Sequence, residues 1–190
     1  SIDPTFLAAM IVVRLQGIVG REVSPEHFAV VTVGTLTSGH TNNTIPGSAT
    51  LVLNCRFYDD DVKARTYTAI ERVVRGECIA SGCGKEPTFT YSNHGELTDN
   101  SPEVFGKVRP LFDAVFDDAS VDAQRWTASE DFSEVPRAFG VPYFFWLIGA
   151  NSDDADAPGN HMPDFLPDYE PVVSASNRAA LAAVLAYLAV

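Results

Sequence analysis

The chain has 190 residues, of which 46% are hydrophobic, and it carries a formal net charge of −12. That length allows one large domain or two small ones, and the hydrophobic share is ordinary for a globular protein with a packed core. The strong negative charge argues against nucleic acid or an anionic membrane surface as a partner.

The cysteines and the apolar runs indicate the cellular compartment. The chain has three cysteines, Cys55, Cys78 and Cys83, so they cannot all form disulfides within one chain. They also lack the two closely spaced cysteine pairs of a typical zinc site. We therefore expect a reduced, cytoplasmic protein. The longest apolar runs, Phe6–Val13 and Val141–Ile148, are far shorter than the roughly 20 residues of a membrane span. We therefore expect neither a membrane segment nor a signal peptide.

The first half of the sequence predicts helix, strand, strand, helix and strand in that order. Asp3 can cap a helix, Pro4 suits its first position, and a helix as apolar as Phe6–Val13 is buried from more than one side. The expected elements are a helix to about Glu22, strands at Phe28–Leu36 and Thr50–Phe57, a helix from Asp59 to about Ser81, and a strand at Pro87–Tyr91. One further strand ahead of Ser1 would complete a split βαββαβ, ferredoxin-like arrangement.

The second half follows a polar connector, and we place the domain boundary so that the domains are 1–96 and 97–190. The expected elements are a helix from Pro102 to about Phe116, a loop at Trp126–Phe132 leading into a short helix, a strand at Tyr143–Ile148, an acidic loop at Asn151–Asn160 and a closing helix at Glu170–Val190. The closing helix is expected to turn Leu181, Val184, Leu185 and Leu188 inward. The continuous apolar strand is typical of a buried, mostly parallel sheet, so the fold class is α/β.

A loop of unusual content joins the first two strands. Gly39–Pro46 carries His40, Asn42 and Asn43, and the alternation of the second strand turns Arg56 away from the core. Amide donors and a guanidinium fork suit a carboxylate, which makes these residues candidate substrate ligands. The alternative is a turn rich in Asn and Gly beside an unrelated surface arginine.

The second half contains the strongest candidate for a metal ligand. His161 follows the acidic loop that comes after a buried strand, which is where α/β sheets place ligand sites, and neutral imidazole binds zinc or manganese. The alternative is a solvated loop histidine. Glu130 and Asp131 are neighbours that point in different directions, so their spacing does not predict a general acid–base pair.

Three segments, taken in order, resemble the M20 family of metallopeptidases and amidohydrolases. The segment 42–46 (NNTIP), with Arg56 and Phe57, resembles the family's NNVIP followed by R-x-F. The segment 128–132 (ASEDF) resembles GSEDF, and 159–165 (GNHMPDF) resembles HHPxFDFDE. The similarity is closest to the branch of N-acyl-amino-acid amidohydrolases, which includes hippurate hydrolases. Each segment alone is a weak signal, and their order over nearly the whole chain is a strong one.

The resemblance implies a fold, an activity and a set of site residues. The region 1–96 would be a ferredoxin-like lid, or dimerisation, domain without its first strand, and 97–190 the C-terminal part of a zinc-peptidase-like catalytic domain. The family hydrolyses N-acyl-amino acids with two divalent metal ions, zinc or manganese, which polarise the carbonyl and activate water. The resemblance assigns Asn42, Asn43, Arg56, Ser129 and Glu130 to the substrate and His161 to the second metal ion. His40 is a further candidate substrate residue through its place in the same loop.

Other motifs of the family do not occur in the sequence. The upstream Cys or His, the HD or HxH motif and the Glu-Glu pair that supplies the general base are missing, so we expect no catalytic residue in this chain. A hydrolytic ion needs about three protein ligands and an open water position, so the chain alone is expected to bind no metal ion and to be inactive. The resemblance also implies a homodimer through the lid. The alternative function is a non-catalytic dimerisation or ligand-binding module, or a pseudoenzyme.

Overall fold

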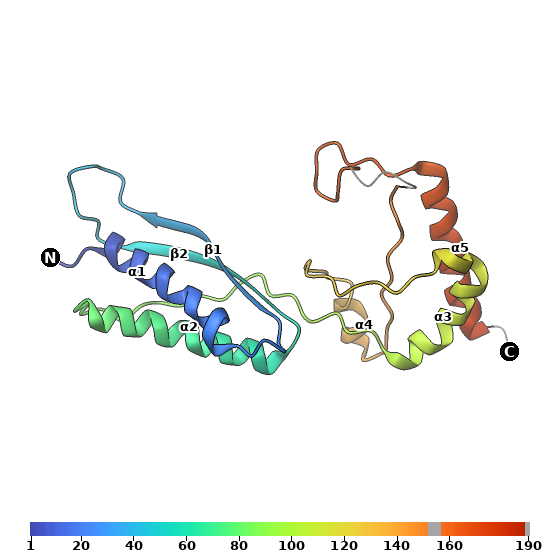
Figure 1. The fold of residues 1–190 in the computed structure, drawn as a ribbon, viewed down its shortest axis with the longest axis horizontal. Coiled ribbons are helices and arrows are strands. Elements are labelled where there is room, and N and C mark those ends of the chain that lie inside the picture. The colour runs from blue at the N-terminus through green and yellow to red at the C-terminus, as the bar shows by residue number, and fades with distance from the viewer. Residues whose placement is uncertain (152–156, 189–190) are drawn as a thin grey trace. The chain divides into compact units, whose positions relative to one another are not determined.

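The computed structural model describes residues 1–151 and 157–188, and the chain divides into two compact units, Ser1–His94 and Gly95–Val190 (Figure 1). The division follows His94, whereas the sequence placed it after Glu96. Most of the acidic part of the loop expected at 151–160, and the last two residues of the closing helix, lie outside the described residues.

The first unit contains the predicted order of helix, strand, strand and helix. These are α1 (Pro4–Gly17) with a π-helical turn η1 (Ile18–Glu22), then β1 (Ala29–Ser38), β2 (Ala49–Phe57) and α2 (Asp60–Ala80). Aspartates cap both helices. Asp3 does so as expected, its Oδ1 accepting the N–H of Thr5 at 2.8 Å, and Asp59 Oδ1 accepts the N–H of Val62 at 2.8 Å. Gly82 follows α2 with a φ of +67°, the left-handed conformation that ends many helices.

The two strands form an antiparallel sheet with both helices on one face (Figure 1). The register runs from Ala29 opposite Phe57 to Ser38 opposite Ala49, with an irregularity between Val33 and Thr35. The core contains Leu7, Ile11, Leu15, Ile18, Ala69, Ile70 and Cys78, and the inward strand residues Val31, Val33, Leu51, Leu53 and Cys55 pack against it. The alternation predicted for the second strand is therefore confirmed.

The strand expected at Pro87–Tyr91 is not formed, which corrects the sequence-based prediction. The segment runs along α2 instead: the Tyr91 hydroxyl donates to Glu71 Oε1 at 2.7 Å, and the Arg75 guanidinium lies 5.1 Å from the centroid of the Phe89 ring. A strand needs a neighbour to take its backbone hydrogen bonds. Among the described residues of this unit the sheet has only β1 and β2, and neither pairs with this segment.

The second unit is built on two packed helices. Its elements are α3 (Pro102–Phe116), a 3-10 turn η2 (Asp117–Ala119), the short α4 (Glu134–Phe139) and α5 (Tyr169–Leu188). Val108 and Phe112 of α3 are buried against Ala179 and Ala182 of α5. Val104, Leu111 and Val115 border the same core, so one apolar side of α3 faces α5.

The apolar segment Tyr143–Ile148 is buried on one side but is not a strand, contrary to the prediction. Phe144, Trp146 and Ile148 pack against the core of α3 and α5. Its backbone is held by Asn100, which donates Nδ2–H to the Phe145 carbonyl at 2.9 Å and accepts the Phe145 N–H at 2.7 Å. No strand beside it is found in the part of the chain that the structure describes, so no ladder can form.

The closing helix α5 turns a different side to the core from the one expected. Leu181 is 60% exposed and Leu188 71% exposed, and Val184 and Leu185 are also exposed, so their predicted inward position was wrong. Alanines face α3 instead, because their small side chains let the two helices approach closely.

Two helical stretches, Pro4–Glu22 and Tyr169–Leu188, have the length and apolar composition that a membrane crossing requires. The same test is passed by core helices of folded domains, and the first stretch supplies Leu7, Ile11, Leu15 and Ile18 to the core of its unit. Length and composition alone are therefore weak evidence for a membrane span.

Candidate functional site

The loop between β1 and β2 projects from the end of the hairpin and carries the candidate substrate ligands (Figure 1). It leaves β1 through Gly39, whose φ of +69° is left-handed, and a Cβ atom there would lie 2.9 Å from Cγ of Pro46. At the base of the loop, Ser38 Oγ donates to the Ser48 carbonyl at 3.1 Å and lies 2.9 Å from Thr5 Oγ1. Sequence reasoning missed Thr5 and Ser38, because a hydroxyl pair 33 residues apart leaves no local signature.

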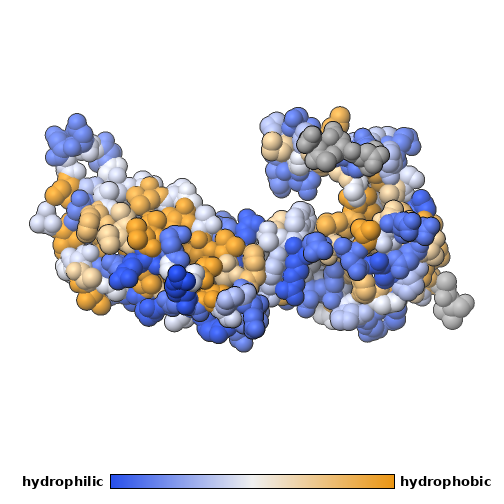
Figure 2. Space-filling model, in the orientation of Figure 1, coloured by the Kyte–Doolittle hydropathy of each residue, from blue (hydrophilic) through white to orange (hydrophobic). Residues whose placement is uncertain are grey.

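This loop surrounds an open hollow of about 760 Å³, which His40, Asn42 and Asn43 help to line. All three side chains are exposed, and the loop is hydrophilic in Figure 2. Thr44 Oγ1 donates to Asn43 Oδ1 at 3.4 Å, which leaves the amide nitrogen of Asn43 as a donor. The structure thus gathers three of the predicted substrate residues, and their amides can donate to a carboxylate or an oxyanion.

Arg56 lies at the other end of β2. It is opposite Val30 near the start of β1, and its Nε donates to Asn54 Oδ1 at 3.1 Å. Arg56 follows Asn54 on the outer face, as predicted, but the length of β2 separates it from the loop by about 20 Å at roughly 3.3 Å per residue. The structure therefore does not bring Arg56 and Asn43 together within one chain, so the two can share one carboxylate only if they come from different subunits.

Cys55, the neighbour of Arg56, has a packing role. Its side chain lies on the opposite face of β2, against the core. Burial raises the pKa of the Cys55 thiol, which disfavours the thiolate that a nucleophile or metal ligand needs.

Ser129 and Glu130 lie in the turn ahead of α4. Glu130 Oε1 accepts the N–H groups of Asp131 at 3.0 Å and Phe132 at 3.2 Å, so this carboxylate holds its own turn, while Ser129 is exposed. Among the described residues, no hydrogen bond or ion pair joins either side chain to His161.

His161 sits in a turn with a φ of +68°, a left-handed conformation that His adopts more readily than most side chains. The Met162 N–H donates to the Gly159 carbonyl at 3.2 Å, and the Phe165 N–H donates to the Met162 carbonyl at 3.1 Å. The imidazole is exposed, but no group of three or more His, Cys, Asp or Glu side chains that could hold a metal ion is found in residues 1–151 and 157–188. His161 can be a ligand, but the described residues do not complete a metal centre.

Comparison with known proteins places these segments in context. No family model matches the chain. It is 30% identical to the hippurate hydrolase of Campylobacter jejuni over 68% of this chain and 34% of the relative. It is 27% identical to the N-acetylcysteine deacetylase of Bacillus subtilis over 97% of this chain and 46% of the relative. The chain therefore spans less than half the length of these relatives.

A solved structure shows the same fold. The Bacillus subtilis YxeP protein, described as a dinuclear metal-binding peptidase from the M20 family, superimposes with a TM-score of 0.71 at 24% identity, over 97% of this chain and 46% of that one. The motif order, the relatives and the fold agree, and the chain matches a C-terminal portion of the relatives. The chain belongs to the M20 family of metallopeptidases and amidohydrolases.

Proposed function

We propose that this chain is the lid and C-terminal part of an amidohydrolase that cleaves the amide bond between an acyl group and an amino acid. The observation that carries the proposal is the hydrophilic loop with Asn42 and Asn43, placed on a fold of the M20 type. Two relatives, a hippurate hydrolase and an N-acetylcysteine deacetylase, are named for substrates that share an acyl group on an amino acid. Such substrates present a carboxylate beside the scissile amide, and amide donors suit that carboxylate.

The metal ions that this chemistry requires would be held mainly by residues outside this chain. A hydrolytic ion needs about three protein ligands and an open position. Among the described residues His161 is the one ligand that the motifs assign, and no group of three candidates gathers around it. Two divalent ions, zinc or manganese, belong to the proposed intact enzyme, and the isolated chain is expected to be inactive.

Because Arg56 lies far from the loop with Asn42 and Asn43, we infer that the arginine and the loop contact different sites. One carboxylate cannot reach both ends of β2, since about 20 Å lies between them. We propose that Arg56 binds substrate in its own subunit, while Asn42 and Asn43 reach the site of a second copy. Each complete site then contains the loop of one chain and the arginine of the other, as a two-fold dimer allows.

The first unit has surfaces that suit such a dimer. Phe6 is 62% exposed and Val13 is 65% exposed on α1, and Figure 2 shows apolar side chains over this unit. Exposed apolar patches of this kind mark interfaces. Each strand of the sheet also has one edge without a partner among the described residues, and β1 contains no proline to prevent pairing with another copy.

The proposal is tested with the longer protein that contains this chain, loaded with zinc or manganese and given N-benzoyl- and N-acetyl-amino acids. We expect metal-dependent hydrolysis, which His161→Ala abolishes, and no turnover by the isolated chain. A longer protein that binds stoichiometric metal but hydrolyses none of these substrates would refute the proposed activity. The second candidate, a non-catalytic dimerisation and ligand-binding module, predicts substrate binding without metal, and metal content therefore separates the two functions.

A further inference from the structure

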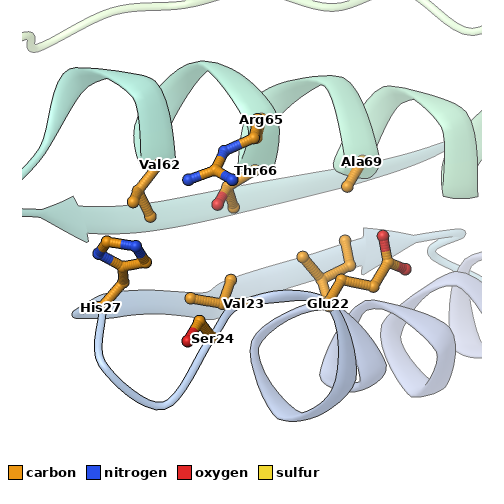
Figure 3. A pocket seen from close by; sticks show the side chains of 9 residues that line it. Glu22, Val23, Ser24, His27, Val62, Arg65, Thr66 and Ala69 are labelled. Carbon is orange, nitrogen blue, oxygen red and sulfur yellow. The ribbon is translucent and has the colours of Figure 1, made fainter.

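A second hollow lies between α2 and the segment that joins η1 to β1 (Figure 3). Its volume is about 180 Å³, and polar and apolar side chains share its lining. Sites for drug-sized ligands are larger, at roughly 300–1,000 Å³, so this hollow suits a ligand of a few heavy atoms.

The hydroxyl of Thr66 is the most unusual group in this hollow. Thr66 is 2% exposed, and its Oγ1 has no hydrogen-bond partner among the described residues. A threonine in a helix usually satisfies its hydroxyl on the carbonyl four residues earlier, and Thr68 does so, donating to the Ala64 carbonyl at 2.9 Å. Thr66, on nearly the opposite face of the same helix, leaves Oγ1 unpaired beside the hollow (Figure 3). A buried hydroxyl without a partner is unfavourable, and a hydrogen bond to a ligand oxygen would offset that cost.

One cationic side chain, Arg65, faces the same space. Arg65 is anchored through Nε, which donates to the Asp61 carbonyl at 3.3 Å, and its two terminal nitrogens have no partner among the described residues. Figure 3 shows the Arg65 guanidinium pointing from α2 toward the His27 ring across the hollow. The carboxylate on this side, Glu22, is already paired with Arg72 at 2.5 Å, so it does not neutralise Arg65. In a chain with a net charge of −12, a guanidinium without an ion-pair partner among the described residues favours an anion at this hollow.

The rest of the lining limits the kind of anion. Ile18, Val23, Val62 and Ala69 form an apolar wall, which would leave a fully hydrated phosphate without partners. A carboxylate has two oxygens in one plane, which match the guanidinium fork, and an alkyl chain can lie on the apolar wall. We propose that this hollow is a binding site for a small monocarboxylate with a short apolar tail, held by Arg65, Thr66 and His27. The site stands on these residues alone and does not depend on the hydrolase activity proposed above.

The test is a titration of the full chain with butyrate, followed by backbone amide chemical shifts in solution. We expect saturable shifts centred on Val62, Thr66 and Ala69, and no such shifts with butyramide, the neutral analogue. Arg65→Gln should weaken binding about tenfold or more, because a charged hydrogen bond is lost, and Thr66→Val by roughly threefold to tenfold. Thr68→Val is the matched control, since its hydroxyl is bonded within the helix, and it should bind butyrate as the wild type does.

Folding and specificity are checked in the same variants. Thr66→Val should be at least as stable to heat as Thr68→Val, because it removes an unpaired hydroxyl rather than a bonded one. Four results would overturn the proposal: no saturable shift with butyrate, equal shifts with butyramide or inorganic phosphate, binding unchanged in Arg65→Gln, or a Thr66→Val protein clearly less stable than Thr68→Val.

Discussion

Gly39→Ala tests whether the loop geometry is as the structure shows it. An alanine at a φ of +69° costs about 1–2 kcal/mol, because its Cβ crowds the following carbonyl. The same Cβ would lie 2.9 Å from Cγ of Pro46, a stiff ring atom, which adds about 1–3 kcal/mol of overpacking. Alanine also restricts the unfolded chain, which stabilises the folded state by about 0.4–1 kcal/mol. The net expectation is a destabilisation of about 3 kcal/mol, or a fall in Tm of roughly 15 °C for a domain of this size.

Gly47→Ala is the matched control in the same loop. A Cβ there meets no atom within 4 Å, and Gly47 is not among the residues of positive φ, so the variant should be neutral or slightly more stable than the wild type. Thermal unfolding of both variants, followed by circular dichroism, measures the difference. Equal Tm values for the two alanine variants would show that Gly39 is not held in the left-handed conformation against Pro46.

Three further predictions concern binding, assembly and pH. In the longer protein, Arg56→Ala should cost about 2–5 kcal/mol in kcat/KM, as removal of one partner of a desolvated charge pair does, and activity within twofold of the wild type would make Arg56 a bystander. Phe6→Glu with Val13→Glu, at two exposed apolar positions of α1, should convert the dimer into a monomer in sedimentation, and a wild type that is already monomeric at micromolar concentration would contradict the interface. The bond to Glu71 raises the pKa of Tyr91 from 10.0 to about 12, so its stabilisation is complete below pH 10 and is lost as pH rises through about 12. Tyr91→Phe should therefore flatten the loss of stability between pH 10 and 12, and an unchanged slope would refute the role of this bond.

The sequence predicted those parts of the fold that local physics determines. Asp3 caps its helix, and the alternation of β2 turns Arg56 outward, because capping and side-chain period act within a few residues. The segments Pro87–Tyr91 and Tyr143–Ile148 were predicted as strands and are not. Strand propensity depends on nearby residues, but a strand forms only beside another strand that pairs with its backbone N–H and C=O groups. No such partner for these two segments is present among the described residues.

The candidate site could also be predicted from the sequence only in part. The motif residues of the loop could be named from the sequence, and the structure gathers His40, Asn42 and Asn43 around one hollow. The motif gives the order of these residues but not their separation in space. That separation comes from β2, which lies between the loop and Arg56. Thr66 was missed because an unpaired hydroxyl is visible only when its surroundings are known. The cytoplasmic location remains a prediction.

Mixing two inactive variants of the longer protein measures whether one complete site draws residues from both subunits. If the loop and Arg56 of one complete site come from different subunits, Asn43→Ala and Arg56→Ala proteins, each inactive alone, should regain activity when they are unfolded and refolded together. Random pairing makes half of the dimers mixed, and one of the two sites in each mixed dimer carries both residues, so about a quarter of the wild-type activity should return. If refolded mixtures stay as inactive as the separate variants while mixed dimers form, the two residues act within one chain and the account is wrong.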